Sequence, residues 1–175
     1  DTYHRTMIDE PTASWRNMTW DAEKENKIMK YLTTRHTGSS DWIWFHENPM
    51  FDRSVISQQI GLDNKKPVIG LLTNVVWDAH LHYPNNAYPN MMEWIFDTIE
   101  HFRMRQDVQL VIRIHPAEIY GNVKSTQTVI DEIKKRYDSL PSSIKIIPPL
   151  SEISTYSLMA LCNSALIYST KTGIE

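Results

Sequence analysis

The chain has 175 residues, 41% of them hydrophobic and 22% charged, a composition that fits one folded domain of ordinary size with an appendage. With 18 basic and 21 acidic side chains the formal net charge is -3, so no positive excess indicates nucleic acid or an anionic membrane as the main partner. One cysteine, Cys162, excludes an intrachain disulfide and favours a reducing compartment. We therefore expect a cytoplasmic protein.

The two ends of the sequence indicate a fragment. Residues 1–5 contain neither a starting Met nor the apolar core of a signal peptide, and no apolar run in the sequence is long enough to cross a bilayer. At the other end the chain stops where a helix is expected to begin. We therefore expect a piece of a longer cytoplasmic protein.

Residues 1–64 predict a helical or irregular segment that precedes the main domain. A helix is expected over residues 19–35, because acidic side chains come first and basic ones last, followed by Gly38. The segment also holds four of the six tryptophans: Trp15, Trp20, Trp42 and Trp44. We expect these rings to pack against a neighbouring domain, and a platform for stacking sugars or bases is the alternative.

Residues 65–175 alternate apolar strands with amphipathic helices. Strands are expected at residues 66–73, 107–114, 143–147 and 165–168. Helices are expected from a cap at Asn90 to about Arg105, from a cap at Asn122 or Ser125 to a point before Pro141, and over residues 154–161. This order predicts an α/β fold with a Rossmann-like parallel sheet, incomplete at its carboxyl end.

In an open parallel sheet, ligands bind outside the carboxyl ends of the strands, so the residues that follow each strand are candidates. Asn74 follows the first strand. Arg113 and His115 end the second and, being two apart in an extended segment, should face the same side. Pro116 holds His115 extended. This pattern predicts one half of a phosphate site, and a simple surface cap on the strand is the alternative.

A hydroxyl-rich turn follows the fourth strand and predicts the other half of the site. Ser169, Thr170 and Thr172 offer hydroxyls, and Gly173 leaves room for a ligand to approach the backbone. Glu175 would lie in the first turn of the helix that begins there. Hydroxyls and free N–H groups at a helix start favour a phosphate or diphosphate group.

The loop after the first strand contains Asp78, His80 and His82 at alternate positions. A metal site is one interpretation, but no fourth ligand is identifiable in the sequence. A loop over the cleft, from which Asp78, His80 or His82 reaches the ligand, is the favoured interpretation. Residues 134–136, two lysines and an arginine, are expected to form the solvated face of a helix.

Residues 66–79, 113–118 and 168–175 resemble the capsule polysaccharide biosynthesis proteins, a bacterial group of glycosyltransferases with the GT-B architecture. The resemblance extends from about residue 21 to the end of the chain. Its most specific parts are the His-Pro pair at residues 115–116 and the Ser-Thr-x-x-Gly-x-Glu pattern at residues 169–175. It implies that the chain is the donor-binding, carboxyl-terminal half of such an enzyme.

The resemblance also implies roles for single residues: His115 contacts the donor phosphate, Arg113 supports it, Ser169, Thr170 and Gly173 line the phosphate turn, Glu175 binds the nucleotide, and Asn74 faces the donor or acceptor. The implied reaction moves a sugar from a CMP- or UDP-linked donor to a saccharide or lipid-linked acceptor, without a metal or other cofactor. The catalytic base is expected in an amino-terminal domain, so activity of this fragment by itself is not expected. A peripheral contact with the export machinery of the inner membrane is a further implication.

Three other functions use similar residues. A glycerol-phosphate transferase and a nucleotide-sugar epimerase are the enzymatic alternatives, and a nucleotide-binding or assembly module without turnover is the non-enzymatic one. A dinucleotide oxidoreductase is disfavoured, because residues 73–77 offer no glycine for a pyrophosphate.

Overall fold

The computed structural model describes residues 13–37, 49–78, 81, 86–120 and 123–173. Its helices are α2 (Ala13–Arg16), α3 (Ala22–Thr37), α4 (Arg53–Ile60), α5 (Met91–Arg103), α6 (Val129–Arg136) and α7 (Thr155–Met159), with 3-10 turns η2 (Pro116–Glu118) and η3 (Lys171–Gly173). No helix in these ranges is both long and apolar enough to span a membrane.

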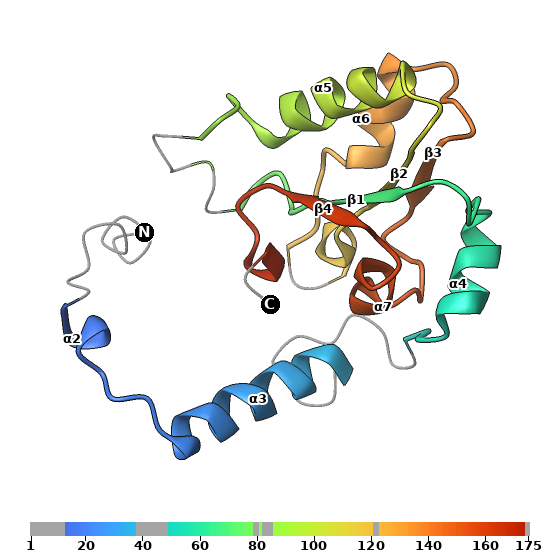
Figure 1. The fold of residues 1–175 in the computed structure, drawn as a ribbon. Coiled ribbons are helices and arrows are strands. Elements are labelled where there is room, and N and C mark those ends of the chain that lie inside the picture. The colour runs from blue at the N-terminus through green and yellow to red at the C-terminus, as the bar shows by residue number, and fades with distance from the viewer. Residues whose placement is uncertain (1–12, 38–48, 79–80, 82–85, 121–122, 174–175) are drawn as a thin grey trace.

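A four-stranded parallel sheet forms the centre of the molecule (Figure 1). The strands are β1 (Val68–Leu72), β2 (Gln109–Arg113), β3 (Ile144–Ile147) and β4 (Ser164–Ile167), in the spatial order β3-β2-β1-β4. Leu72, the last residue of β1, pairs with Arg113 of β2 and with Ile167 of β4. The Rossmann-like α/β class expected from the alternation of strands and helices is confirmed.

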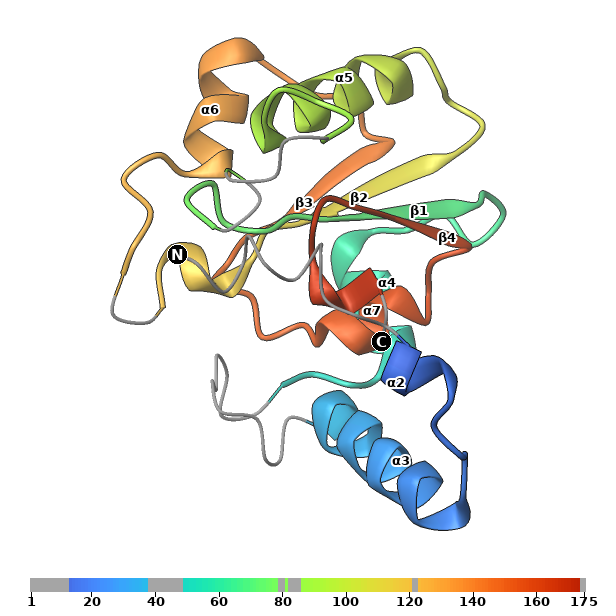
Figure 2. The same cartoon turned by 90° about the vertical axis from the view of Figure 1, so that its left-hand side faces the viewer.

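Helices cover both faces of the sheet. α5 and α6 lie on one face, and α4 and α7 lie on the other (Figures 1 and 2). Two apolar cores correspond to these layers. Leu110 and Ile112 of β2 belong to the core beneath α5 and α6, whereas Val111 between them packs with Ile56 of α4 and Leu158 of α7. Side chains alternate along a strand, and a strand that is apolar at every position is therefore buried on both faces.

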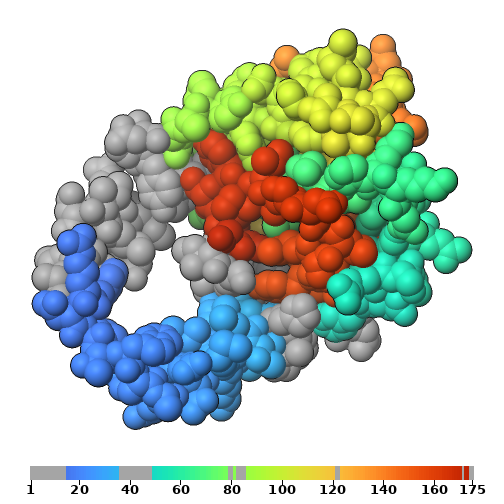
Figure 3. Space-filling view, in the orientation of Figure 1, coloured from blue at the N-terminus to red at the C-terminus, as the bar shows by residue number. Residues whose placement is uncertain are grey.

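The amino-terminal helices α2 and α3 lie outside these layers. They stand apart from the sheet in both ribbon views and project from the side in the space-filling view (Figures 1, 2 and 3). Trp15 and Trp20 are 56% and 59% exposed. Trp42 and Trp44 fall outside the described residues. Packing of this segment against a neighbouring domain stays a prediction.

Part of the segment expected to precede the domain packs directly on the sheet. Asp52 caps α4 by accepting hydrogen bonds from the N–H groups of Ser54 and Val55, and Ile56 of this helix is fully buried. The preceding Met50 forms a parallel bridge with Ile153. Residues 50–60 are thus held against the layer that contains α7.

The predicted helix starts were right for α5 and wrong for α6. Asn90 caps α5, its side chain accepting a hydrogen bond from the N–H of Glu93. The cap of α6 is Thr128, not Ser125, and Asn122 lies outside the described residues. Ser125 instead accepts a hydrogen bond from Trp77 Nε1 at 3.1 Å. Thr128 directly precedes the buried Val129, which is where a cap must stand to begin the apolar stripe.

Candidate functional site

The order of the strands reverses between β1 and β4. From β1 the chain moves outward to β2 and β3, and then crosses back to place β4 on the other side of β1. The connections on the two sides of this point lie on opposite faces of the sheet, and in open α/β sheets ligands bind in a crevice at the carboxyl ends of the strands at such a point. We call this edge of the sheet the crevice. The loops after β1, β2 and β4 all leave this edge, on the left in Figure 2.

His115 lies at this edge, two residues after the last residue of β2. Its backbone N–H donates to the hydroxyl of Thr73 at 2.9 Å, and its Nδ1 accepts the N–H of Ala117 at 3.0 Å. An Nδ1 that accepts carries no proton, so the neutral ring holds its hydrogen on Nε2, the atom that is able to donate. Burial lowers the pKa of His115 to about 4, the charge of Arg113 adds to the shift, and Asp78 opposes it. The imidazole is therefore a neutral donor at pH 7.

Arg113 is buried, with 2% of its surface exposed. Its Nη1 donates to the carbonyl of Pro148 at 2.6 Å and its Nη2 to that of Ser151 at 3.1 Å. Burial lowers the pKa of the guanidinium to about 10, so it remains charged at neutral pH. These bonds hold the loop that follows β3. Because both Nη atoms donate to that loop, Arg113 would support a phosphate through its positive charge.

Asn74 was expected to face a donor or acceptor molecule, but its side chain is turned inward and is 6% exposed. Its Nδ2 donates to Asp78 Oδ2 at 2.7 Å and to the carbonyl of Ser169 at 3.2 Å. Its Oδ1 accepts the N–H of Val75 at 2.8 Å. The amide therefore joins the loop after β1 to the turn after β4. These two chain segments are far apart in the sequence and meet because β1 and β4 pair in the sheet. In this structure the amide is turned towards these two chain segments.

The turn after β4 begins with an unusual backbone. Ser169 has a φ of 47°, the one positive φ among the described residues other than glycine. Thr170 follows, and its carbonyl accepts the N–H of Gly173 at 3.3 Å. Its hydroxyl lies 3.5 Å from that of Thr172. The hydroxyl-rich segment predicted from the sequence is therefore a compact turn at the crevice.

Gly173 has a packing reason to be glycine. A Cβ added there would lie 1.9 Å from Cδ1 of Ile167, so this residue closes the turn back onto β4. The residues from Lys171 to Gly173 form a 3-10 turn rather than the first turn of an α-helix. Glu175, expected in that helix, and His80, expected in the loop over the crevice, both lie outside the described residues.

No protein-family model matches this chain, and no curated protein and no solved structure matches it significantly. Its function must be inferred from the chemistry of the site.

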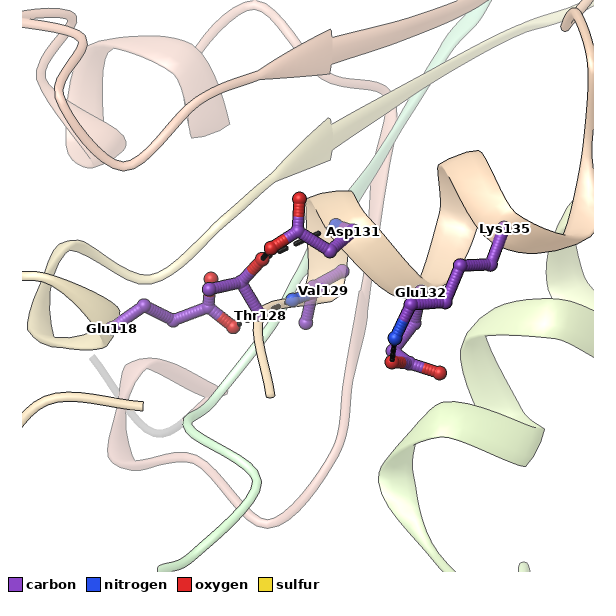
Figure 4. A network of polar contacts seen from close by, with 6 residues as sticks. All are labelled: Glu118, Thr128, Val129, Asp131, Glu132 and Lys135. Carbon is purple, nitrogen blue, oxygen red and sulfur yellow. Dashed lines mark hydrogen bonds and ion pairs between the residues drawn. The ribbon is translucent and has the colours of Figure 1, made fainter. Parts of the chain in front are cut away.

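Sequence reasoning missed a buried carboxyl group next to the His-Pro turn. Glu118 is 1% exposed, and its Oε1 accepts the N–H of Val129 at the first residue of α6, at 3.0 Å (Figure 4). Its Oε2 has no hydrogen-bond partner among the described residues. Burial raises the pKa of this carboxyl group, and the charge of Asp131 adds to the shift. The sequence does place Glu118 three residues after His115, which caps the 3-10 turn η2. That spacing predicts a hydrogen bond from Glu118 back to the cap residue, not the bond to α6 that the structure has.

Proposed function

We propose that this chain is the donor-binding part of a glycosyltransferase, which moves a sugar from a CMP- or UDP-linked donor to a growing capsule or surface polysaccharide. The single observation that supports this most is the reversal of strand order between β1 and β4. His115 follows β2 and the turn at residues 169–173 follows β4, and these are the two strands that flank β1. Nucleotides bind at this position in open α/β sheets, and the donors present there suit a phosphate group.

The chemistry of transfer asks for the kind of groups that this edge offers. An acceptor hydroxyl attacks the anomeric carbon, a new C–O bond forms, and the bond to the phosphate oxygen breaks. The leaving nucleotide takes the bonding electrons, so its phosphate gains negative charge. The Nε2–H of His115 and the hydroxyls of Thr170 and Thr172 would donate to that phosphate. In this proposal a second domain supplies the base that takes the acceptor's proton.

Calorimetric titration of the 175-residue chain tests the donor site. CMP, UDP and CDP are compared with cytidine and uridine, which lack the phosphate. We expect the nucleotides to bind more tightly than the nucleosides, and His115→Ala to weaken nucleotide binding by about tenfold while leaving nucleosides little changed. His101→Ala, an exposed position on α5, is the matched control. A folded chain that binds none of these compounds would refute the proposal.

The exposed tryptophans favour a second candidate, a nucleotide-binding or assembly module without turnover. Trp15 and Trp20 offer large apolar surface away from the crevice, where a partner protein could cover it. The two functions separate in a turnover assay of this chain together with the second domain that the first proposal requires. A glycosyltransferase then turns over a nucleotide sugar in the presence of saccharide acceptors, and a module binds nucleotide without consuming it.

A further inference from the structure

Both the NH2 group and the oxygen of the Asn74 amide are hydrogen-bonded to other groups of the protein. One N–H of its amide reaches Asp78 on its own loop, and the other reaches Ser169, 95 residues away in the sequence. The amide oxygen takes the N–H of Val75. All these contacts are made by a side chain that is 94% buried, given its exposed fraction of 6%.

The three contacts fix the orientation of the amide and explain why an amide is needed. A rotated amide would point its oxygen at a carboxylate and a carbonyl, both acceptors, and its NH2 group at the N–H of Val75, a donor. An aspartate has the same shape, but a carboxylate oxygen would replace the NH2 group. That oxygen would face the carboxylate of Asp78 and the carbonyl of Ser169, and three acceptors would meet without a donor. Only the amide of asparagine donates on one side and accepts on the other within this length.

The contact with Ser169 falls on the strained point of the turn. Ser169 has a φ of 47°, in the left-handed region that residues with a Cβ adopt at a cost. The orientation of its carbonyl is tied to this conformation, and Asn74 Nδ2 holds that carbonyl at 3.2 Å. Thr170 and the 3-10 turn at residues 171–173 follow directly, so the conformation of Ser169 sets the direction in which this turn leaves β4.

The same amide also places the carboxylate of Asp78. Asp78 Oδ2 lies 2.7 Å from Asn74 Nδ2, and the N–H of Asp78 donates to the carbonyl of Val75 at 3.2 Å. Asp78 is close enough to His115 for its charge to act on the imidazole. One buried side chain thus links the loops on the two sides of the crevice.

We propose that Asn74 is a positioning residue, which clamps the turn after β4 in the conformation that binds the donor phosphate and does not itself contact the donor. This inference rests on the proposed nucleotide site. It assigns to Asn74 an effect on the phosphate part of the ligand that is exerted through Ser169.

A double-mutant cycle tests the clamp. Asn74→Ala is measured in the natural chain and in the Ser169→Gly chain, because glycine adopts a positive φ without the cost that serine carries. We expect Asn74→Ala to weaken CMP or UDP binding by about tenfold with Ser169 present, the size of one lost hydrogen bond, and by less than about threefold with Gly at this position. Cytidine and uridine binding should change little in either chain.

Equal losses in the two chains, or no loss at all, would overturn the clamp. Equal losses for nucleotide and nucleoside would also overturn it, because a general defect in folding acts on both. Asn64→Ala, an exposed position before β1 at the opposite edge of the sheet, is the matched control. If Asn74→Ala does not fold, Asn74→Ser takes its place, since a hydroxyl can still accept the N–H of Val75 but is too short to reach Ser169.

Failure of the proposed function is distinguishable from failure of the clamp. If the natural chain binds no nucleotide, the proposed function is wrong, and the same four proteins are compared by urea unfolding. The clamp then requires that the two substitutions be non-additive, with Asn74→Ala costing less in the Ser169→Gly chain. Additive effects would reject it.

Discussion

The backbone N–H of His115 donates a hydrogen bond to the hydroxyl oxygen of Thr73 at 2.9 Å. The N–H of Thr73 in turn donates to the carbonyl of Arg113 at 3.1 Å. These bonds continue the pairing of β1 with β2 beyond the ends of the strands. The first joins backbone groups, whereas the one from His115 ends on the side-chain hydroxyl of Thr73. The position of His115 therefore depends on the hydroxyl group of the residue that follows the neighbouring strand β1.

Thr73→Val removes that hydroxyl and keeps the shape of the side chain. Thr73 is buried, so the N–H of His115 would lose its partner without gaining water, and we expect a loss of about 1–3 kcal/mol in the free energy of unfolding. Thr73→Ser keeps the acceptor and should cost less. Urea unfolding of the three proteins measures the difference, and a Thr73→Val chain as stable as the natural one would contradict the role of this bond.

The half-buried imidazole of His115 makes the folded state sensitive to acid. Its pKa is lowered from the ordinary 6.5 to about 4, so between these values the unfolded chain binds the proton more readily than the folded one. Stability is fully present above pH 6.5 and falls as the pH is lowered towards 4. At about 1.4 kcal/mol per pH unit, at most about 3 kcal/mol is lost across this window.

His115→Asn tests this dependence, because its side-chain oxygen can still accept the N–H of Ala117 but does not titrate. We expect the stability of the natural chain relative to the variant to decline between pH 6.5 and 4 in chemical unfolding experiments. A constant difference across that window would show that His115 titrates normally.

Glu118 should give a dependence of the opposite sign. Its folded pKa is raised above the ordinary 4.5, so the folded chain holds the proton more readily and stability falls as the pH rises above 4.5. Glu118→Gln keeps an acceptor for the N–H of Val129 and removes the titration. In chemical unfolding experiments the natural chain should lose stability relative to this variant as the pH rises above 4.5.

Glu132 of the same helix is the control for Glu118. Its carboxylate is paired with Lys135 at 2.7 Å, which lowers its pKa. The contribution of Glu132 is therefore present above pH 4.5 and lost below it, so the stability of the natural chain relative to Glu132→Gln should rise with pH. Slopes of the same sign for Glu118→Gln and Glu132→Gln would be inconsistent with the buried position of Glu118.

The left-handed backbone of Ser169 predicts an unusual response to glycine. Ser169→Gly should leave stability unchanged or raise it by up to about 1 kcal/mol, whereas Ser169→Val should lower it by about 1–2 kcal/mol, because a β-branched side chain resists a positive φ. Ser164→Gly, at the start of β4, should destabilise, since glycine weakens a strand. Thermal unfolding compares the variants, and a loss at Ser169→Gly as large as that at Ser164→Gly would argue against the strained turn.

Local patterns predicted most of the secondary structure around the sheet. The apolar runs at β1 and β2 were recognisable because both faces of these strands are buried, and the cap at Asn90 because its partner Glu93 is three residues away. The start of α6 was misplaced because residues 122–128 contain several side chains able to cap, and Ser125 is engaged by Trp77, 48 residues distant. The sequence of residues 122–128 alone does not indicate that the indole of Trp77 donates a hydrogen bond to Ser125.

The sequence by itself determined the α/β class and the alternation of strands with helices, because apolar periodicity and helix capping are local patterns along the chain. The site expected at the strand ends stays a prediction. Only the tertiary structure decided where the polar groups at those ends point. Arg113 turns to the carbonyls of the loop after β3, Asn74 turns to Ser169, and Glu118 reaches α6. A buried donor or acceptor must find a partner, and here those partners lie far away in the sequence and are brought within reach by the packed sheet.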